Sequence, residues 1–203
     1  MPEPSLYPEL KTEFWEQRYQ ERTDRWDLGQ PAPPFVHLLN SADAPTPGRM
    51  IVLGSGNGHD ALLFAKHGFE VLGIDFAPSA IAHAQAAAHA EHLTAEFIQR
   101  DIFEFANDWS GQFDYVLEHT CFCAIAPHQR SAYVSLAHEL LCQNGELIGL
   151  FWAHSKPGGP PFGTTPDEIR DLFSQKFQHL NLHQATNSVT SRAPDEYLGR
   201  FFA

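Results

Sequence analysis

The sequence has little cysteine and no long hydrophobic run. It holds three cysteines in 203 residues, a small and odd number that argues against a disulfide framework. Its apolar runs are far shorter than the ~20 residues that cross a bilayer. The first residues, Met1–Ser5, lack the basic and apolar regions of a signal peptide. These absences predict a reduced, cytoplasmic protein with no membrane-spanning segment.

Basic residues are also scarce. Lysine and arginine total 13 against 25 aspartates and glutamates, which gives a formal net charge of −12 at pH 7. A negative field of this size repels phosphate backbones and anionic lipids, so no nucleic-acid partner and no membrane partner is expected. We expect a small-molecule ligand and a monomer.

The remaining composition is ordinary for a globular chain, with 43% apolar and 19% charged residues. The length predicts a single domain over residues 1–203. Three stretches of the chain differ in amino-acid composition and pattern. Residues 1–48 are rich in proline, tryptophan and charge, residues 49–152 alternate apolar runs with helical patterns, and residues 153–203 begin with a proline and glycine loop.

The middle stretch predicts buried strands separated by helices. Short apolar runs indicate strands at residues 49–53, 70–75, 96–100, 113–117 and 146–152. Helical patterns lie between them, at residues 60–67, 78–91 and 127–142. Strands that alternate with helices form right-handed βαβ units. The sequence therefore predicts an α/β, doubly wound fold with a parallel sheet covered on both faces.

A glycine-rich loop leaves the first predicted strand. It reads Leu53-Gly-Ser-Gly-Asn-Gly-His-Asp60, so the pattern is Gly-x-Gly-x-Gly. Glycine lets the backbone turn tightly and lets a ligand lie against it with no Cβ in the way. A dinucleotide fingerprint would need glycine at position 59, and no Gly-Lys-Ser/Thr follows that would indicate a P-loop. Asp60 at the helix start is a poor neighbour for pyrophosphate and a good one for the ammonium of an amino-acid moiety.

Acidic residues follow the second and third predicted strands. Asp75 ends the second strand, 21 residues after Gly54, where a carboxylate can accept both hydroxyls of a ribose. Asp101 follows the third strand, where an acid can face an adenine amino group and the N–H of Ile102 can face the ring. Together with Gly54 and Gly56, these acids predict an adenosine-type ligand. The alternative is that the glycines form only a turn and the acids are solvated.

Several local strings of this sequence resemble one enzyme superfamily. They are Phe14-Trp15-Glu16-x-x-Tyr19, Trp26-Asp27-x-Gly29, the glycine loop, the run Phe113–Ala124, Pro127-x-x-Arg130 and Gly158-Gly-Pro-Pro-Phe162. With them, residues 13–175 resemble the class I S-adenosylmethionine-dependent methyltransferases, and within that class the thiopurine S-methyltransferase and plant halide/thiol methyltransferase superfamily. The glycine loop marks only the large class, whereas the N-terminal aromatics and the Gly-Gly-Pro-Pro loop are specific to the superfamily.

The resemblance implies a seven-stranded, mostly parallel Rossmann-like sheet that binds S-adenosyl-L-methionine. It makes residues 1–48 an N-terminal helical lid, residues 49–152 the cofactor-binding core and residues 153–203 the substrate-side loop and last strands. The cofactor-binding positions that it implies, together with those expected from the glycine loop, are Trp15, Tyr19, Trp26, Gly54, Gly56, Asp60, Asp75, Asp101, Ile102 and His119. Cys121 stands where phenylalanine is usual, so the resemblance does not name the methyl acceptor.

The N-terminal aromatic residues also have a physical reason to lie near the cofactor. A sulfonium is a cation, and the faces of Trp15, Tyr19 and Trp26 attract cations by ~0.5–2 kcal/mol. The alternative is that Phe14, Trp15 and Tyr19 form the buried stripe of an N-terminal helix. The two interpretations are compatible.

His119 is the candidate catalytic residue because it follows the fourth strand at the mouth of the sheet. It could act as a base or orient a nucleophile, or it could simply be a hydrogen-bonded loop histidine. The spacing His119-x-Cys121-x-Cys123 lacks a second ligand pair, so no metal is expected. No base–orienter arrangement is readable for a nucleophilic cysteine.

Two functions follow from these observations. The first is an enzyme that transfers a methyl group from S-adenosylmethionine to a small soft nucleophile, either a thiol, a related chalcogen compound or a halide. A thiol with a pKa near 8.5 is already partly ionised at neutral pH, so a strong base is not required. The second is a non-catalytic module that binds the cofactor and acts through a protein partner.

Overall fold

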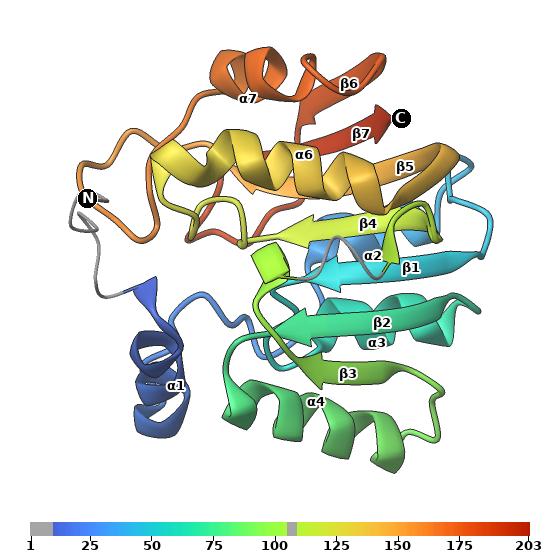
Figure 1. Ribbon diagram of the computed structural model, residues 1–203, viewed down its shortest axis with the longest axis vertical. Coiled ribbons are helices and arrows are strands. Elements are labelled where there is room, and N and C mark those ends of the chain that lie inside the picture. Colours follow the sequence, from blue (N-terminus) through green and yellow to red (C-terminus); the bar gives the residue numbers. More distant parts are fainter. Residues whose placement is uncertain (1–9, 105–108) are drawn as a thin grey trace.

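A single seven-stranded sheet organises the chain (Figure 1), for which the computed structural model describes residues 10–104 and 109–203. Residues 1–9, including the Met1–Ser5 stretch considered above, lie outside the described part. The strands are β1 (Arg49–Leu53), β2 (Glu70–Asp75), β3 (Glu96–Gln99), β4 (Phe113–His119), β5 (Leu141–Trp152), β6 (His179–Gln184) and β7 (Glu196–Phe202). Their order is β3-β2-β1-β4-β5-β7-β6, and β7 runs antiparallel to both neighbours. The predicted α/β, mostly parallel sheet is confirmed.

Helices cover both faces of this sheet. One face packs against α2 (Pro33–Leu39), α3 (His59–Lys66) and α4 (Pro78–Ala90), and the other against α6 (Arg130–Leu140) and α7 (Pro166–Phe173). Side chains alternate along β1, so Met50 and Val52 enter the first core and Ile51 and Leu53 the second. Because both faces are buried, the strand reads as a continuous apolar run.

Two predicted boundaries were wrong. The helix expected at residues 127–142 is a 3₁₀ turn, η3 (Pro127–Gln129), followed by α6, which ends at Leu140. β5 begins at Leu141 rather than at residue 146, and its register against β4 shifts between Phe113 and Tyr115. Asn144 adopts a φ of 64°. The Asn144-Gly145 pair therefore belongs to an irregular part of the strand and does not close the helix.

The N-terminal segment contains a helix that the sequence did not predict. α2 lies within residues 1–48, and its Phe35 and Leu38 are buried against the sheet. With seven residues, this helix is too short for its apolar positions to show a period. Within residues 10–104 and 109–203, no helix is long and apolar enough to cross a membrane.

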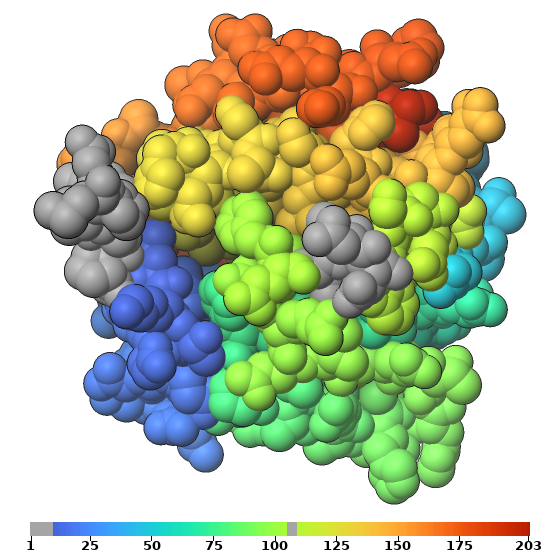
Figure 2. Space-filling view, viewed as in Figure 1, coloured from blue at the N-terminus to red at the C-terminus, as the bar shows by residue number. Residues whose placement is uncertain are grey.

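Helix α1 (Thr12–Glu21) lies beyond the carboxyl ends of the strands, beside the start of α4 (Figure 1). The carboxylate of Glu16 accepts hydrogen bonds from the backbone N–H of Ser79, at 2.9 Å, and from its hydroxyl. In the space-filling view, the blue N-terminal segment packs against this side of the molecule (Figure 2). The segment expected to form a lid therefore borders the end of the sheet where a ligand would bind.

Candidate active site

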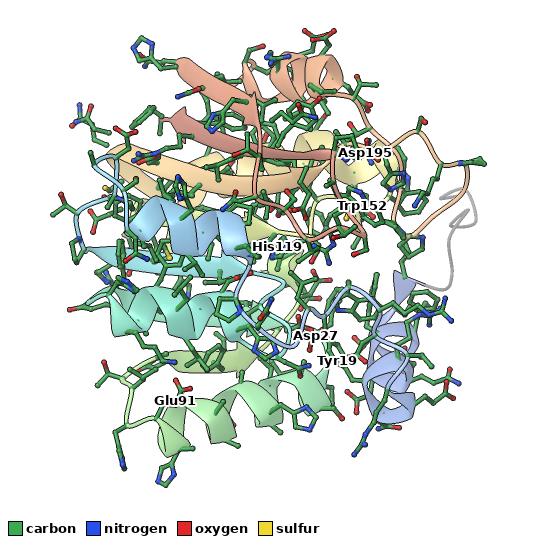
Figure 3. The ribbon with its side chains drawn as sticks, turned by 180° about the vertical axis from the view of Figure 1, so that it is seen from behind. Tyr19, Asp27, Glu91, His119, Trp152 and Asp195 are labelled. Carbon is green, nitrogen blue, oxygen red and sulfur yellow. The ribbon has the colours of Figure 1, made fainter. Side chains whose placement is uncertain are left out.

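A cavity of about 840 Å³ opens at the carboxyl ends of the parallel strands. Its walls come from the N-terminal segment, the loops after β1 to β5 and the segment before β7. Tyr19, Asp27, His119 and Trp152 lie at this end of the molecule, and Glu91 lies at the other (Figure 3). A volume of this size is typical of small-molecule sites. All ten residues predicted to bind the cofactor line this cavity.

The glycine loop leaves space that side chains would fill. Gly54, Gly56 and Gly58 all have positive φ angles, of 65°, 52° and 83°. A Cβ on Gly54 would lie 3.0 Å from Cys121 Sγ, and a Cβ on Gly56 would lie 3.1 Å from Tyr19 Oη. Glycine is thus required both by the backbone conformation and by the close approach of neighbouring groups.

Asp75 is held by the glycine loop that faces it. Its Oδ2 accepts the backbone N–H of Gly56 at 2.8 Å, and its Oδ1 accepts that of Ala77 at 2.9 Å. Burial raises the pKa of Asp75, while these backbone hydrogen bonds oppose the rise. Each carboxylate oxygen retains a second lone pair. The side chain can therefore still accept the two hydroxyls of a ribose.

The end of β3 forms another part of the wall. Asp101 Oδ1 accepts the backbone N–H of Phe103 at 2.8 Å, which starts the 3₁₀ turn η2 (Ile102–Glu104). Ile102 is 6% exposed and packs into the core beneath the cavity. Burial raises the pKa of Asp101. An acidic group and an apolar side chain are thus adjacent in this part of the cavity wall.

The three N-terminal aromatic residues form one cluster. The Trp26 ring lies edge-on to those of Trp15, at 5.4 Å between centroids, and Tyr19, at 5.5 Å. Trp26 Nε1 donates to Tyr19 Oη at 3.2 Å. The cluster packs against Ala77 and Ala80 at the start of α4. Of the stripe expected from Phe14, Trp15 and Tyr19, only Tyr19 is buried, and the other two are half-buried. Trp15, Tyr19 and Trp26 all line the cavity, and their contact with a sulfonium stays a prediction.

His119 is held between an acid and a base. Its Nδ1 lies 2.6 Å from Asp60 Oδ2, and its Nε2 lies 2.7 Å from Arg192 Nη1. Burial opposes a charge on the ring, and the Asp60 carboxylate raises the pKa of His119 against it. Because a guanidinium can only donate, a hydrogen bond with Arg192 needs Nε2 as the acceptor and Nδ1–H as the donor to Asp60. The contact with Arg192 fits the neutral ring, whereas the Asp60 and Glu196 carboxylates raise the pKa of His119 to about 9 and favour the charged one. In either state both ring nitrogens lie against other protein groups.

This arrangement leaves neither ring nitrogen of His119 open to a substrate proton. The other oxygen of Asp60, Oδ1, accepts the backbone N–H of Ala32 at 2.7 Å. The Asp60 carboxylate thus connects the start of α2, through the Ala32 N–H, to the end of β4, through His119. The engagement of both ring nitrogens argues against His119 as a base. Each oxygen of Asp60 retains a second lone pair, and Asp60 lines the cavity, so its role as a partner of the cofactor ammonium stays a prediction.

Arg192 and Glu196 belong to the same cluster, and sequence reasoning missed both. They are 4% and 2% exposed, and Arg192 Nη1 donates to Glu196 Oε1 at 3.1 Å. Arg192 lies in the irregular segment before β7, outside every motif considered above. A Ser-Arg pair before a terminal strand carries no recognisable spacing, so no local signal could have revealed it.

The two cysteines after β4 are poor nucleophiles. Burial raises the pKa of Cys121 well above its ordinary value and that of Cys123 to about 12. The Cys123 thiol donates to the carbonyl of Thr120 at 3.3 Å, and the Thr120 hydroxyl donates to the carbonyl of His119 at 2.6 Å. Among the described side chains, no three histidine, cysteine or acidic groups converge as metal ligands.

Arg130 ties the Gly-Gly-Pro-Pro loop to the cavity wall. It is 2% exposed, and its Nη2 lies 3.2 Å from the carbonyl oxygen of Phe162 and 3.1 Å from that of Gly163. The backbone N–H of Phe162 in turn donates to the carbonyl of Cys123 at 2.6 Å. The Pro127-x-x-Arg130 and Gly158–Phe162 motifs thus form one structural unit beside the cavity.

The strand order and the glycine-lined cavity define a class I S-adenosylmethionine-dependent methyltransferase. The family model of thiopurine S-methyltransferase matches residues 10–197. The chain belongs to this family and is an enzyme that transfers a methyl group from S-adenosylmethionine to a thiol-type nucleophile. The predictions of family, cofactor and enzyme class are confirmed.

Curated relatives and solved structures agree with this assignment. The chain is 31% identical to thiocyanate methyltransferase 1 of Arabidopsis thaliana, over 97% of this chain and 87% of the relative. It is 23% identical to thiopurine S-methyltransferase of Acinetobacter baylyi, over 83% and 86% of the two chains. The fold is similar to that of 1,6-didemethyltoxoflavin-N1-methyltransferase of Burkholderia thailandensis, with a TM-score of 0.75, 20% identity and coverage of 100% and 90%.

Proposed function

We propose that the methyl acceptor is a small thiol or a related soft anion of the thiocyanate type. The observation that carries this proposal is the 31% identity to a thiocyanate methyltransferase along 97% of the chain. The charge of the cavity supports it. Although the whole chain carries −12, five basic side chains line the cavity against four acidic ones, the basic ones being Arg18, Arg25, Arg100, Lys156 and Arg192. The cavity is therefore less negative than the chain as a whole, which favours the entry of an anionic acceptor.

We further propose how the residues of the chain hold the cofactor. Asp75 accepts the ribose hydroxyls, Asp101 accepts the adenine amino group, and Ile102 packs against the adenine ring. The glycine loop leaves room for the amino-acid moiety, and the rings of Trp15, Tyr19 and Trp26 face the sulfonium. The bound cofactor supplies an electrophilic methyl group. These assignments follow from the lining of the cavity and from the glycine positions.

In this proposal the protein aligns the acceptor and excludes water, and it supplies no strong base. A thiol with a pKa near 8.5 is already partly ionised at neutral pH, and both nitrogens of His119 are engaged. His119 would then shape the wall beside the acceptor instead of removing a proton. Alignment of this kind contributes much of the rate in a bimolecular transfer.

The experiment is transfer from methyl-labelled S-adenosylmethionine to matched acceptors. Thiocyanate, hydrosulfide, 2-mercaptoethanol and iodide should yield volatile labelled products, whereas cyanate and ethanol should yield far less. Because cyanate has oxygen where thiocyanate has sulfur and is otherwise the same anion, the pair isolates the preference for sulfur as the nucleophile. Binding of S-adenosylhomocysteine without turnover on any acceptor would favour the non-catalytic module.

We also propose that the enzyme acts as a cytoplasmic monomer. Sedimentation should give one species near 22.8 kDa. A concentration-dependent dimer would contradict this part of the proposal.

A further inference from the structure

Arg192 joins three separate parts of the molecule around the cavity. Its Nη1 donates to Glu196 on β7 and to His119 at the end of β4, at 3.1 and 2.7 Å. Its Nη2 donates to the backbone carbonyl of Trp26 in the N-terminal segment. The side chain is 5% exposed. One buried guanidinium thus links the segment above the cavity to the sheet below it.

The carbonyl that Arg192 contacts belongs to the residue at the centre of the aromatic cluster. The Trp26 ring touches both Trp15 and Tyr19 and donates to the Tyr19 hydroxyl. Fixing the main chain of Trp26 therefore fixes the ring that connects the other two. Through His119 the same guanidinium also reaches Asp60, the second residue of α3, directly after the glycine loop.

We propose that Arg192 is a positioning residue that latches the N-terminal aromatic cluster over the cofactor cavity. The proposal rests on the proposed function in one respect, namely that this cluster covers the cofactor. Arg192 does not touch the reacting atoms in this role. It acts through the Trp26 main chain on one side and through His119 and Asp60 on the other.

The planar fork of arginine explains why this residue type is needed. A guanidinium can donate to several acceptors in fixed directions, whereas a lysine ammonium is a compact charge on a flexible stem. Arg192→Lys would keep the charge opposite Glu196 and would lose the simultaneous contacts with His119 and Trp26. The variant thus removes the contacts with His119 and Trp26 while it keeps the buried ion pair with Glu196.

The first test is hydrogen exchange of the full-length protein without ligand. In Arg192→Lys, amides in residues 12–30 should exchange at least ~5-fold faster than in the wild type, and those of β1, β4 and β5 should not change. Arg130→Lys is the matched control, since Arg130 is equally buried but holds the Gly-Gly-Pro-Pro loop. Unchanged exchange in residues 12–30, or an equal acceleration in Arg130→Lys, would overturn the proposal.

The second test separates cofactor binding from turnover. In Arg192→Lys, the Kd for S-adenosylhomocysteine and the KM for S-adenosylmethionine should each rise about tenfold, with kcat changed much less. An unchanged Kd would overturn the latch. Failure of the wild type to methylate any acceptor would instead contradict the proposed acceptor class, because exchange and Kd need no acceptor.

A second variant keeps the proposal testable if Arg192→Lys does not fold. Arg192→Met combined with Glu196→Met removes the buried pair as a unit and leaves no uncompensated charge, a change that is often tolerated. The double variant should show the same faster exchange in residues 12–30 and the same weaker binding of S-adenosylhomocysteine. Wild-type exchange in that folded variant would reject the latch.

Discussion

Asp75 and Glu118 are buried carboxyl groups on the two strands that flank β1, and their surroundings give them different properties. Asp75 lines the cavity and is bound by two backbone N–H groups. Glu118 is 1% exposed behind the cavity wall, where it accepts the backbone N–H of Phe122 at 2.9 Å and the hydroxyl of Tyr133. Burial raises the pKa of Glu118 to about 7 against these hydrogen bonds. The first group faces the cavity, and the second holds the loop after β4.

Replacing Asp75 should weaken cofactor binding. We expect Asp75→Ala to reduce the affinity for S-adenosylhomocysteine by ~1.5–3 kcal/mol, since charge-assisted hydrogen bonds to the ribose are lost. Calorimetric titration measures the change. Asp114→Ala is the control, because Asp114 binds the Arg49 N–H at the opposite end of the sheet. Unchanged affinity in Asp75→Ala would mean that the ribose lies elsewhere.

Replacing Glu118 should change how stability depends on pH. The folded state holds the Glu118 proton up to about pH 7, whereas the unfolded chain releases it near 4.5. The free energy of unfolding therefore falls as pH rises between these values, and the loss is complete above pH 7. Glu118→Gln should be more stable than the wild type by roughly 2–4 kcal/mol at pH 8, with little difference at pH 5.

Urea unfolding at the two pH values measures this effect. Glu91→Gln is the control, because Glu91 is exposed at the far end of the molecule (Figure 3). The same difference between wild type and Glu118→Gln at pH 5 and pH 8 would show that Glu118 does not titrate in this range.

The N-terminal segment is attached to the core at several points. Asp27 receives hydrogen bonds from His59, at 3.1 Å, from the Gly29 N–H, at 2.6 Å, and from Asn57. Burial tends to raise the pKa of Asp27, but these hydrogen bonds outweigh it and lower the pKa to about 2. α1 and the turns between it and α2 otherwise lie outside the sheet. The polar contacts and one aromatic cluster hold this segment outside the sheet, and we predict that it opens when no ligand is bound.

Hydrogen exchange should detect this opening. We expect residues 10–30 to exchange readily in the free protein and ~10-fold more slowly with S-adenosylhomocysteine, because lids order when a ligand fills the site beneath them. β1 and β4 should be protected in both states and serve as the internal reference. Equally slow exchange of residues 10–30 with and without ligand would show that the segment is ordinary core.

The molecule as a whole combines an acidic surface with a cavity of mixed charge. Its formal net charge is −12 at pH 7 with the histidines counted as neutral. The cavity lies between the sheet and the N-terminal segment, so a ligand contacts parts of the chain that would separate on unfolding. Ligand binding and the stability of the folded state are therefore linked.

This linkage predicts a thermal shift. S-adenosylhomocysteine at a hundredfold excess over its Kd should stabilise the protein by about 2.7 kcal/mol, which corresponds to roughly 5–10 °C in Tm for a chain of this size. Differential scanning fluorimetry measures the shift, with NAD as the comparison ligand. A clear shift with NAD and none with S-adenosylhomocysteine would contradict the cofactor assignment.

The sequence by itself determined the order of β1 to β5 and of α3, α4 and α6 between them, the glycine loop and the acids after β2 and β3. These features depend on neighbours within a few residues, so hydrophobic periodicity and turn chemistry express them directly. Parallel strands then place their carboxyl ends at one edge, which brought Gly54, Asp75 and Asp101 to one cavity without further information.

Only the tertiary structure decided what His119 can do. Its partner Arg192 lies 73 residues away in the chain, and Asp60 lies 59 residues away. Such contacts depend on how β4, α3 and the segment before β7 pack together, and a hydrogen bond between distant side chains leaves no period in the sequence. The same holds for the contacts of Arg130 with Phe162 and Gly163. Local patterns specify the elements, whereas the protonation and pairing of a buried side chain depend on the groups that packing brings next to it.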